Sequence, residues 1–216
     1  MLAGDLEDPL AGSKQVLGVI PPPPHDCIFM LQRLGIALTH VSDFDTNGYM
    51  HWKGTQGGTQ AYQNPQKIGA VRTDASSKSG GYAAHSFVQG KEWDGKPNST
   101  NSGPNQWLSV AMRNGDAFEV NHYCLRHGSS YGWRRLRSWE LQGREGDSAG
   151  WVTLRKHTND EVLADEGFAT AGWAVEGGKG SFSQFRVLQT GPNSSGLNYL
   201  CCAGLELYGM LLPGGS

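Results

Sequence analysis

The second half of the sequence is divided into short segments that alternate apolar and polar residues. A strand buried on one face shows this period of two, because successive side chains point to opposite sides of the sheet. Turn-forming pairs such as Asn114-Gly115 lie between the segments. Short strands at this spacing predict an all-β fold with antiparallel sheets, of the sandwich or jelly-roll kind. The predicted strands are residues 107–112, 118–126, 138–143, 151–155, 172–175, 182–189 and 205–211.

The composition excludes several other classes of protein. Glycine accounts for 31 of the 216 residues, which is about twice its usual share and too much for a helix bundle or coiled coil. No run approaches the roughly 18 apolar residues that span a membrane, so no membrane insertion is predicted. The formal net charge of −2 argues against a protein that binds nucleic acid by neutralising phosphates.

The first half is less regular. Residues 1–25 are predicted to be a leader whose four prolines at 21–24 form a polyproline II spacer; the domain then occupies residues 26–212, and 213–216 form a tail. The run 27–38 is apolar almost all round, so periodicity does not separate a buried helix from a buried strand, although its 3–4 spacing favours a helix. Short strands are predicted at 49–53 and 67–73, with loops at 54–66 and 74–105.

The cysteines indicate a reducing environment. Cys27, Cys124, Cys201 and Cys202 form no CxxC pair and are too few for a disulfide scaffold, so we expect buried free thiols. The N-terminus is acidic. It lacks the basic region followed by an apolar core that a signal peptide has. These two features predict a cytoplasmic protein.

Several short motifs carry a resemblance to a known superfamily. Residues 123–128 (YCLRHG), 136–143 (LRSWELQG) and 151–154 (WVTL), with the closing segments 185–196 and 205–209, resemble the discoidin-type galactose-binding-like β-sandwich. With the segments 43–48, 52–55 and 64–65, the order of motifs over residues 42–212 is similar to the SUN-like domain of a large HECT-class ubiquitin ligase and its BTB-associated and protist relatives. The resemblance implies a galactose-binding-like jelly-roll sandwich with an N-terminal extension, and a role as an adaptor or in substrate recognition.

In the discoidin-type superfamily, loops at one end of the sandwich bind the ligand. Arginine can hold a carboxylate bidentately, and aromatic rings can stack on arginine or on a sugar. The predicted function is therefore non-catalytic recognition of a protein partner; a carbohydrate-binding module and a structural subunit of a larger assembly are the alternatives. The candidate binding residues are Arg126, His127, Tyr131, Trp133, Arg134, Arg135, Gln189 and Asn193. If these residues bind no ligand, they form a solvated loop in which Arg137 and Trp139 pack for structural reasons and Arg134 and Arg135 are merely exposed.

No metal, cofactor or catalytic group is predicted. Asp43, Asp45 and Asn47 have the spacing of an EF-hand loop, but its twelfth position is Gly54 rather than a glutamate. A structural calcium ion there is the alternative to simple Asx-turns. The seven histidines include no HxxxH pair, and neither a GxSxG elbow nor an acid that could orient a Cys124–histidine pair is evident. The sequence therefore indicates a protein that is not an enzyme.

Overall fold

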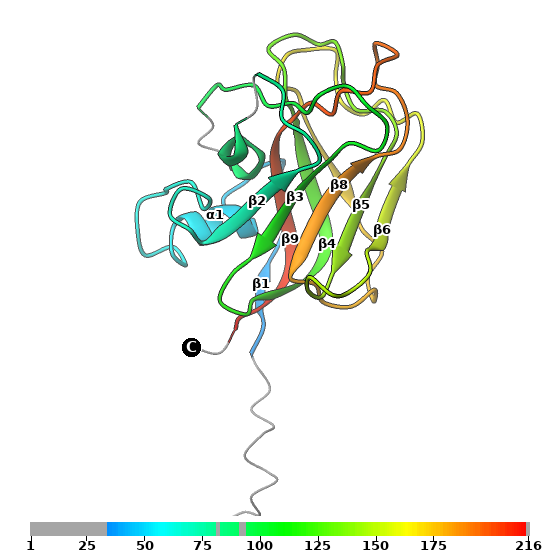
Figure 1. Ribbon diagram of the computed structural model, residues 1–216. Coiled ribbons are helices and arrows are strands. Elements are labelled where there is room, and N and C mark those ends of the chain that lie inside the picture. The colour runs from blue at the N-terminus through cyan, green and yellow to red at the C-terminus, as the bar shows by residue number, and fades with distance from the viewer. Residues whose placement is uncertain (1–33, 81–82, 91–93, 215–216) are drawn as a thin grey trace, which may run out of the picture. The chain divides into compact units, whose positions relative to one another are not determined.

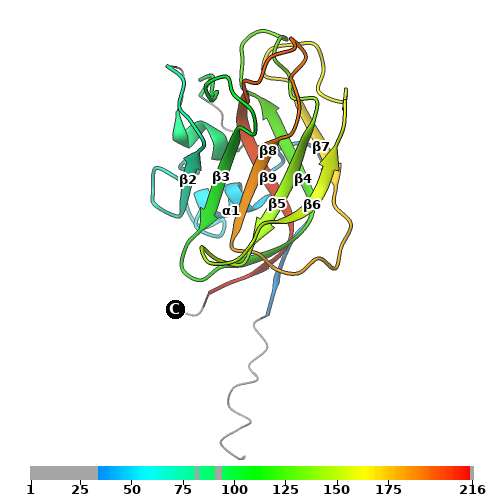
Figure 2. The ribbon, with the colours of Figure 1, turned by 45° about the vertical axis from the view of Figure 1, so that its right-hand side comes forward.

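The computed structural model describes residues 34–80, 83–90 and 94–214. Two antiparallel sheets lie face to face (Figure 1; Figure 2), with strand orders β1-β9-β4-β7 and β2-β3-β8-β5-β6. The predicted all-β galactose-binding-like sandwich is confirmed. The strands are β1 (Ile36–Leu38), β2 (Val71–Ala75), β3 (Trp107–Met112), β4 (Ala117–His127), β5 (Trp139–Arg144), β6 (Val152–His157), β7 (Thr170–Ala174), β8 (Gln184–Gln189) and β9 (Cys202–Leu212). One α-helix, α1 (Tyr49–Gly54), and one 3-10 helix, η2 (Ala84–Val88), lie among them.

The core fills the space between the two sheets. On β8, Phe185 and Val187 are fully buried, and they alternate with the half-buried residues Gln184, Arg186 and Leu188. On β4, Tyr123 and Leu125 point into the same core, so His122, Cys124 and Arg126 point to the other face of the sheet. This alternation makes the outer face of the four-stranded sheet polar, although it too is largely buried.

The strands predicted in the second half are confirmed. The segment 107–112 coincides with β3, and the other six predictions each overlap a strand of the structure. Asn114 and Gly115 have φ values of 59° and 70°, as a two-residue turn between β3 and β4 needs. Cys124, Cys201 and Cys202 are buried free thiols, as expected, while Cys27 lies outside the described residues.

Two predictions in the first half are wrong. In the run 27–38, the helix is contradicted for Ile36–Leu38, which pairs with β9 as strand β1; residues 27–33 lie outside the described part. The strand predicted at 49–53 is helix α1. The strand predicted at 67–73 begins only at Val71. The boundaries predicted at 25 and 26 also fall outside the described residues.

Helix α1 forms because a distant side chain caps it. The Glu206 carboxylate, on the outer face of β9, accepts hydrogen bonds from the backbone N–H groups of Met50 (2.6 Å) and His51 (3.2 Å). These N–H groups have no partner inside the helix. Gly48 precedes the helix because a Cβ there would lie 2.2 Å from the Glu206 side chain. The residues near the helix in sequence carry no trace of this cap, which is why the segment was predicted as a short strand.

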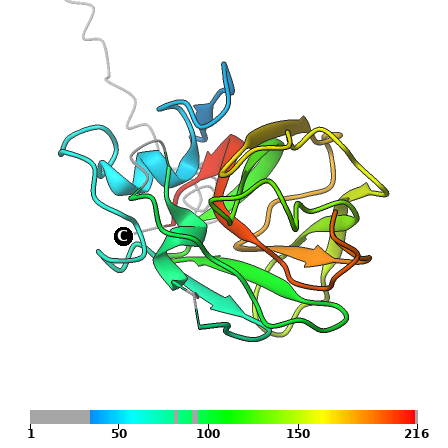
Figure 3. The same ribbon diagram turned by 90° about the horizontal axis from the view of Figure 1, so that it is seen from above.

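The segment before α1 and the helix itself cover the outer face of the four-stranded sheet. Figure 3 shows this part of the chain, in blue and cyan, lying beside β9 and β4 rather than between the sheets. Phe44 packs there with Cys124 and Tyr208 in a small cluster of its own. The sandwich thus has a third, irregular layer on one side only.

Candidate functional site

Three loops meet at one end of the sandwich. Strands β4, β6 and β8 end there and β5, β7 and β9 begin there, so the loops 128–138, 158–169 and 190–201 lie together. This is the end opposite the one at which β9 finishes (Figure 1). It is also the place where the sequence predicted a binding surface.

Aromatic side chains and an arginine gather on these loops. Tyr131 is 65% exposed and Trp133 is 59% exposed, and their ring centroids lie 5.3 Å apart. The Arg134 guanidinium lies 4.3 Å from the Tyr199 ring centroid and 6.0 Å from that of Trp133. We call Tyr131, Trp133, Arg134 and Tyr199 the loop-end surface. It presents large apolar rings with a positive charge among them.

The loop that follows β8 fixes the backbone of this surface. The N–H of Arg134 donates to Ser195 Oγ (3.1 Å), and the N–H of Arg135 donates to Ser194 Oγ (3.0 Å). Asn193 is buried, and its Oδ1 accepts the N–H groups of Ser195 (3.0 Å) and Leu197 (3.2 Å). Asn193 therefore shapes the loop from beneath instead of facing solvent, which departs from its predicted role as a ligand-binding group.

The structure also buries His127, Arg135 and Gln189, which the sequence placed in the binding site. His127 Nε2 donates to the Tyr131 carbonyl (3.0 Å), and burial lowers the pKa of this imidazole. Arg135 forms an ion pair with Asp165. His127 and Arg135 thus hold the loops in place, and Asp165 already neutralises the charge that Arg135 would offer a ligand.

Arg126 lies farther away, on the outer face of β4. Its guanidinium donates to the carbonyl oxygens of Gln89 (3.4 Å) and Gly90 (3.1 Å) and lies 4.1 Å from the Phe44 ring centroid. The sequence placed Arg126 beside the loop residues because it ends the same strand. Alternation along β4 turns it away from them and into the layer that covers the sheet.

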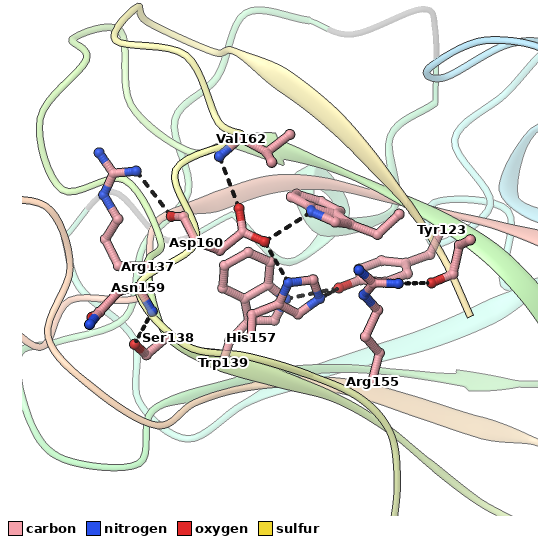
Figure 4. Close-up of polar contacts among 11 residues, drawn as sticks. Tyr123, Arg137, Ser138, Trp139, Arg155, His157, Asn159, Asp160 and Val162 are labelled. Atoms are coloured by element: carbon pink, nitrogen blue, oxygen red, sulfur yellow. Dashed lines mark hydrogen bonds and ion pairs between the residues drawn. The ribbon is translucent and has the colours of Figure 1, made fainter. Parts of the chain in front are cut away.

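A buried polar network beneath the loops was missed in the sequence (Figure 4). Trp139 Nε1 donates to the Tyr123 hydroxyl (3.0 Å), which bonds His157 Nε2 (2.7 Å). His157 Nδ1 bonds Asp160 Oδ2 (2.7 Å), which also accepts from Trp173 Nε1 (3.1 Å). Tyr123, Trp139 and His157 are almost wholly buried, so this network joins β4, β5, β6 and β7 rather than facing a substrate.

The acidic segment before α1 divides into two roles. Asp45 accepts backbone N–H groups from Val41 (2.7 Å), Ser42 (3.0 Å) and Asn47 (2.7 Å), which confirms the predicted Asx-turn. Asp43 instead accepts a hydrogen bond from the Cys124 thiol, with 3.5 Å between Sγ and Oδ1. Asp43 and Asp45, two of the three residues considered for a calcium ion, therefore bond different partners.

Several known proteins are similar to this chain in sequence. The chain is 36% identical over 177 residues to the E3 ubiquitin-protein ligase hecd-1 of Caenorhabditis elegans, an alignment covering 81% of this chain and 6% of that protein. It is 29% identical to the E3 ubiquitin-protein ligase Ufd4 of Drosophila melanogaster, over 83% of this chain and 7% of that protein. A BTB/POZ domain-containing protein of Arabidopsis thaliana is also 29% identical, over 80% of this chain and 22% of that protein. No protein-family model matches.

Solved structures decide the fold. A module from a family 31 glycoside hydrolase of Clostridium perfringens superposes with a TM-score of 0.53 at 13% identity, over 65% of this chain and 92% of that one. An F5/8 type C domain from Bacteroides fragilis superposes with a TM-score of 0.51 at 20% identity, with the same coverages. The chain has the discoidin-type, galactose-binding-like fold. This sandwich corresponds to a small part of the ligases that it matches in sequence.

Another solved neighbour is a Clostridium perfringens module in complex with GalNAc-β-1,3-galactose, with a TM-score of 0.51 at 14% identity over 65% of this chain and 96% of that one. At such identities the likeness concerns the fold alone. In the described part of this galactose-binding-like chain, no helix is long and apolar enough to cross a membrane.

Proposed function

We propose that this sandwich is a non-catalytic recognition module that binds a protein partner through the loop-end surface. The observation that carries the proposal is the solvent exposure of Tyr131 and Trp133 beside Arg134, on loops that a rigid sandwich holds in place. Tryptophan, tyrosine and arginine dominate the energetic centres of protein interfaces. Loops positioned by a stable scaffold are a common place for such contacts.

The charge of the surface indicates the chemistry of the partner. Arg134 supplies the positive charge of the loop-end surface, whereas Arg135 is neutralised by Asp165. A carboxylate on the partner could bond the Arg134 guanidinium while an apolar side chain packs on Trp133. We therefore expect an acidic peptide segment that contains at least one large apolar residue.

The sequence relatives suggest the setting. Two of them are E3 ubiquitin-protein ligases, and this chain matches a small share of each. A binding module inside such a protein would select substrates or regulators while another part performs the chemistry. We propose that this chain acts in that setting, with its own residues taking no part in catalysis.

Affinity capture with defined variants tests the proposal. We expect a partner captured by the wild-type chain to be lost with a Trp133→Ala/Arg134→Ala double variant and retained with Arg113→Ala/Val152→Ala, which alters exposed residues away from the loop end. Purified partner should then bind directly, with the same ranking of variants. Equal binding by both double variants would refute this use of the surface.

A carbohydrate ligand is the second candidate. It is supported by the fold shared with the Clostridium module that holds a disaccharide, and by exposed rings on which a sugar could stack. A glycan array followed by thermal denaturation separates the two functions. A glycan that raises the melting temperature, and does so less for Trp133→Ala, would favour this candidate over the protein partner.

A further inference from the structure

The layer that covers the four-stranded sheet brings together a second set of functional groups. His122 and Cys124 project from the outer face of β4, and His40 and Asp43 lie over them from the segment before α1. The His40 and His122 rings stack, with centroids 3.6 Å apart. In the described residues, a nitrogen of each histidine and the Cys124 sulfur lie within 4.8 Å of one another.

The Asp43 carboxylate lies close to two of these groups. Asp43 Oδ1 lies 3.7 Å from His40 Nε2 and 3.5 Å from Cys124 Sγ. Ligand atoms around a tetrahedral zinc ion are roughly 3.4 Å apart, as follows from bonds of about 2.0 to 2.3 Å. The donor atoms of His40, His122 and Cys124, with the Asp43 carboxylate beside two of them, therefore approach the spacing of ligands around one shared ion. Because the two imidazoles are stacked at an interplanar angle of 17°, one of them would have to turn so that both lone pairs point at the ion.

The imidazole nitrogens are the second, independent observation. In the part of the chain that the structure describes, Nε2 of His40 and Nε2 of His122 are buried and have no hydrogen-bond partner. A buried polar atom without a partner destabilises the folded protein, because it has lost its hydrogen bonds to water and gained none in return. Coordination to a metal would satisfy both nitrogens, since a neutral imidazole offers its lone pair to the ion.

A glycine lets the candidate ligands come together. Gly172 on β7 pairs with Cys124, and the place where its Cβ would stand lies 2.7 Å from both Asp43 Oδ1 and His122 Nε2 and 3.0 Å from Cys124 Sγ. Three candidate ligand atoms therefore converge against the backbone of Gly172, where the side chain of a larger residue would push them apart. The His40 and Asp43 side chains are 23% and 34% exposed, which gives an ion a path from solvent.

We propose that His40, Asp43, His122 and Cys124 form a binding site for a divalent transition-metal ion, with Zn²⁺ as the ion that fits. Two imidazoles, one thiolate and one carboxylate are a donor set that zinc accepts in tetrahedral geometry. Binding requires the Cys124 thiol to release its proton to solvent. The ion would tie the segment before α1 to β4 and so hold the covering layer on the sheet.

Co²⁺ and Zn²⁺ titrations of the purified, reduced full-length chain test the site. We expect one Co²⁺ per chain, with the visible bands of a tetrahedral ion and a near-ultraviolet thiolate charge-transfer band. Zn²⁺ should displace Co²⁺ and raise the melting temperature, and a chelator should reverse this rise. Weak binding without these bands, or without a definite stoichiometry, would overturn the proposal.

Variants locate the ion. Cys124→Ser should abolish the charge-transfer band, and His122→Gln should weaken binding by more than about 100-fold, the upper end for loss of outer-shell partners. Gly172→Ala keeps all four ligands but would push them apart, so it should also weaken binding. Cys27→Ser and Cys201→Ser are the matched thiol controls and should bind as the wild type does.

Stability of the metal-free variants keeps the result interpretable. Metal-free Cys124→Ser and His122→Gln should keep a cooperative thermal transition, because the proposed ion is absent from both the variant and its reference. If the charge-transfer band persists in Cys124→Ser, or disappears in Cys27→Ser, the ion binds elsewhere and this site is refuted.

Discussion

At the scale of single residues, the most consequential side chain is the buried carboxyl of Glu206. It accepts backbone N–H groups from Met50, His51 and Leu207. Burial nevertheless dominates and raises the pKa of Glu206 to about 8. A single carboxyl thus couples strand β9 to helix α1 and makes that coupling dependent on pH.

The raised pKa of Glu206 predicts a definite pH dependence of stability. Between its ordinary value near 4.5 and about 8, the folded state keeps a proton that the unfolded state has lost. The contribution of Glu206 to the free energy of unfolding should therefore fall as pH rises through this window, by up to about 1.4 kcal/mol per pH unit, whereas buried histidines with lowered pKa values contribute in the opposite sense. Urea denaturation at several pH values measures this slope.

Glu206→Gln is the control for this prediction. The amide does not titrate, so the slope should flatten between pH 4.5 and 8, whatever the variant's absolute stability. Parallel profiles for the wild type and Glu206→Gln would show that another group is responsible.

The Tyr123 hydroxyl gives a second prediction for a single residue. Tyr123→Phe leaves Trp139 Nε1 and His157 Nε2 without their partner in the core. The expected loss of unfolding free energy is about 1–3 kcal/mol. Tyr131→Phe, which removes a hydroxyl from an exposed ring, is the control and should change stability by less than about 0.5 kcal/mol. Equal effects of the two changes would contradict a structural role for the network.

Residue roles were the hardest feature to predict from the sequence. Of the predicted binding residues, Tyr131 and Trp133 are exposed and Arg134 is half-buried, but Arg126, His127 and Arg135 are buried. Proximity in sequence cannot show which face of a strand or loop a side chain occupies once a bulge intervenes, and β4 shifts register between Arg126 and His127. Likewise, His40 meets His122 only through the folded chain.

At the scale of elements, helix α1 depends on tertiary contacts. It has six residues, and an isolated helix of this length is unstable in water. Its cap comes from β9, which local propensity cannot register. Hairpins behave in the opposite way: the turn at Asn114 and Gly115 is specified by those two residues, so the strands on either side were predictable.

Gly48→Ala tests the docking of α1. The added Cβ would stand 2.2 Å from the Glu206 side chain, so the carboxylate or the helix must move. Overpacking of this kind costs about 1–3 kcal/mol, which denaturant unfolding can measure. Gly146→Ala adds a methyl group with nothing within 4 Å and is the matched control. Similar stabilities of the two variants would contradict the proposed contact.

At the scale of the whole molecule, the proposed binding surface and the layer that covers the four-stranded sheet lie in different parts of the sandwich. Period-two alternation predicted the two sheets, because burial on one face of a strand leaves a clear mark in sequence. The covering layer was not predictable, since it depends on outward residues such as Arg126 and Glu206 that look like ordinary exposed positions. The loop-end surface and this layer therefore make separate contributions, which paired arginine variants can distinguish.

Arg126→Ala should change stability but not binding, and Arg134→Ala should change binding but not stability. Arg126→Ala removes donors from the buried carbonyl oxygens of Gln89 and Gly90 and should lower the free energy of unfolding by about 1–3 kcal/mol. At a temperature where the variant is folded, its binding of a partner or glycan should be unchanged. Arg134→Ala should leave stability within about 0.5 kcal/mol of the wild type and weaken binding. Loss of binding in folded Arg126→Ala would place recognition on the covered face of the sheet, because that guanidinium lies against Phe44 there and not at the loop end.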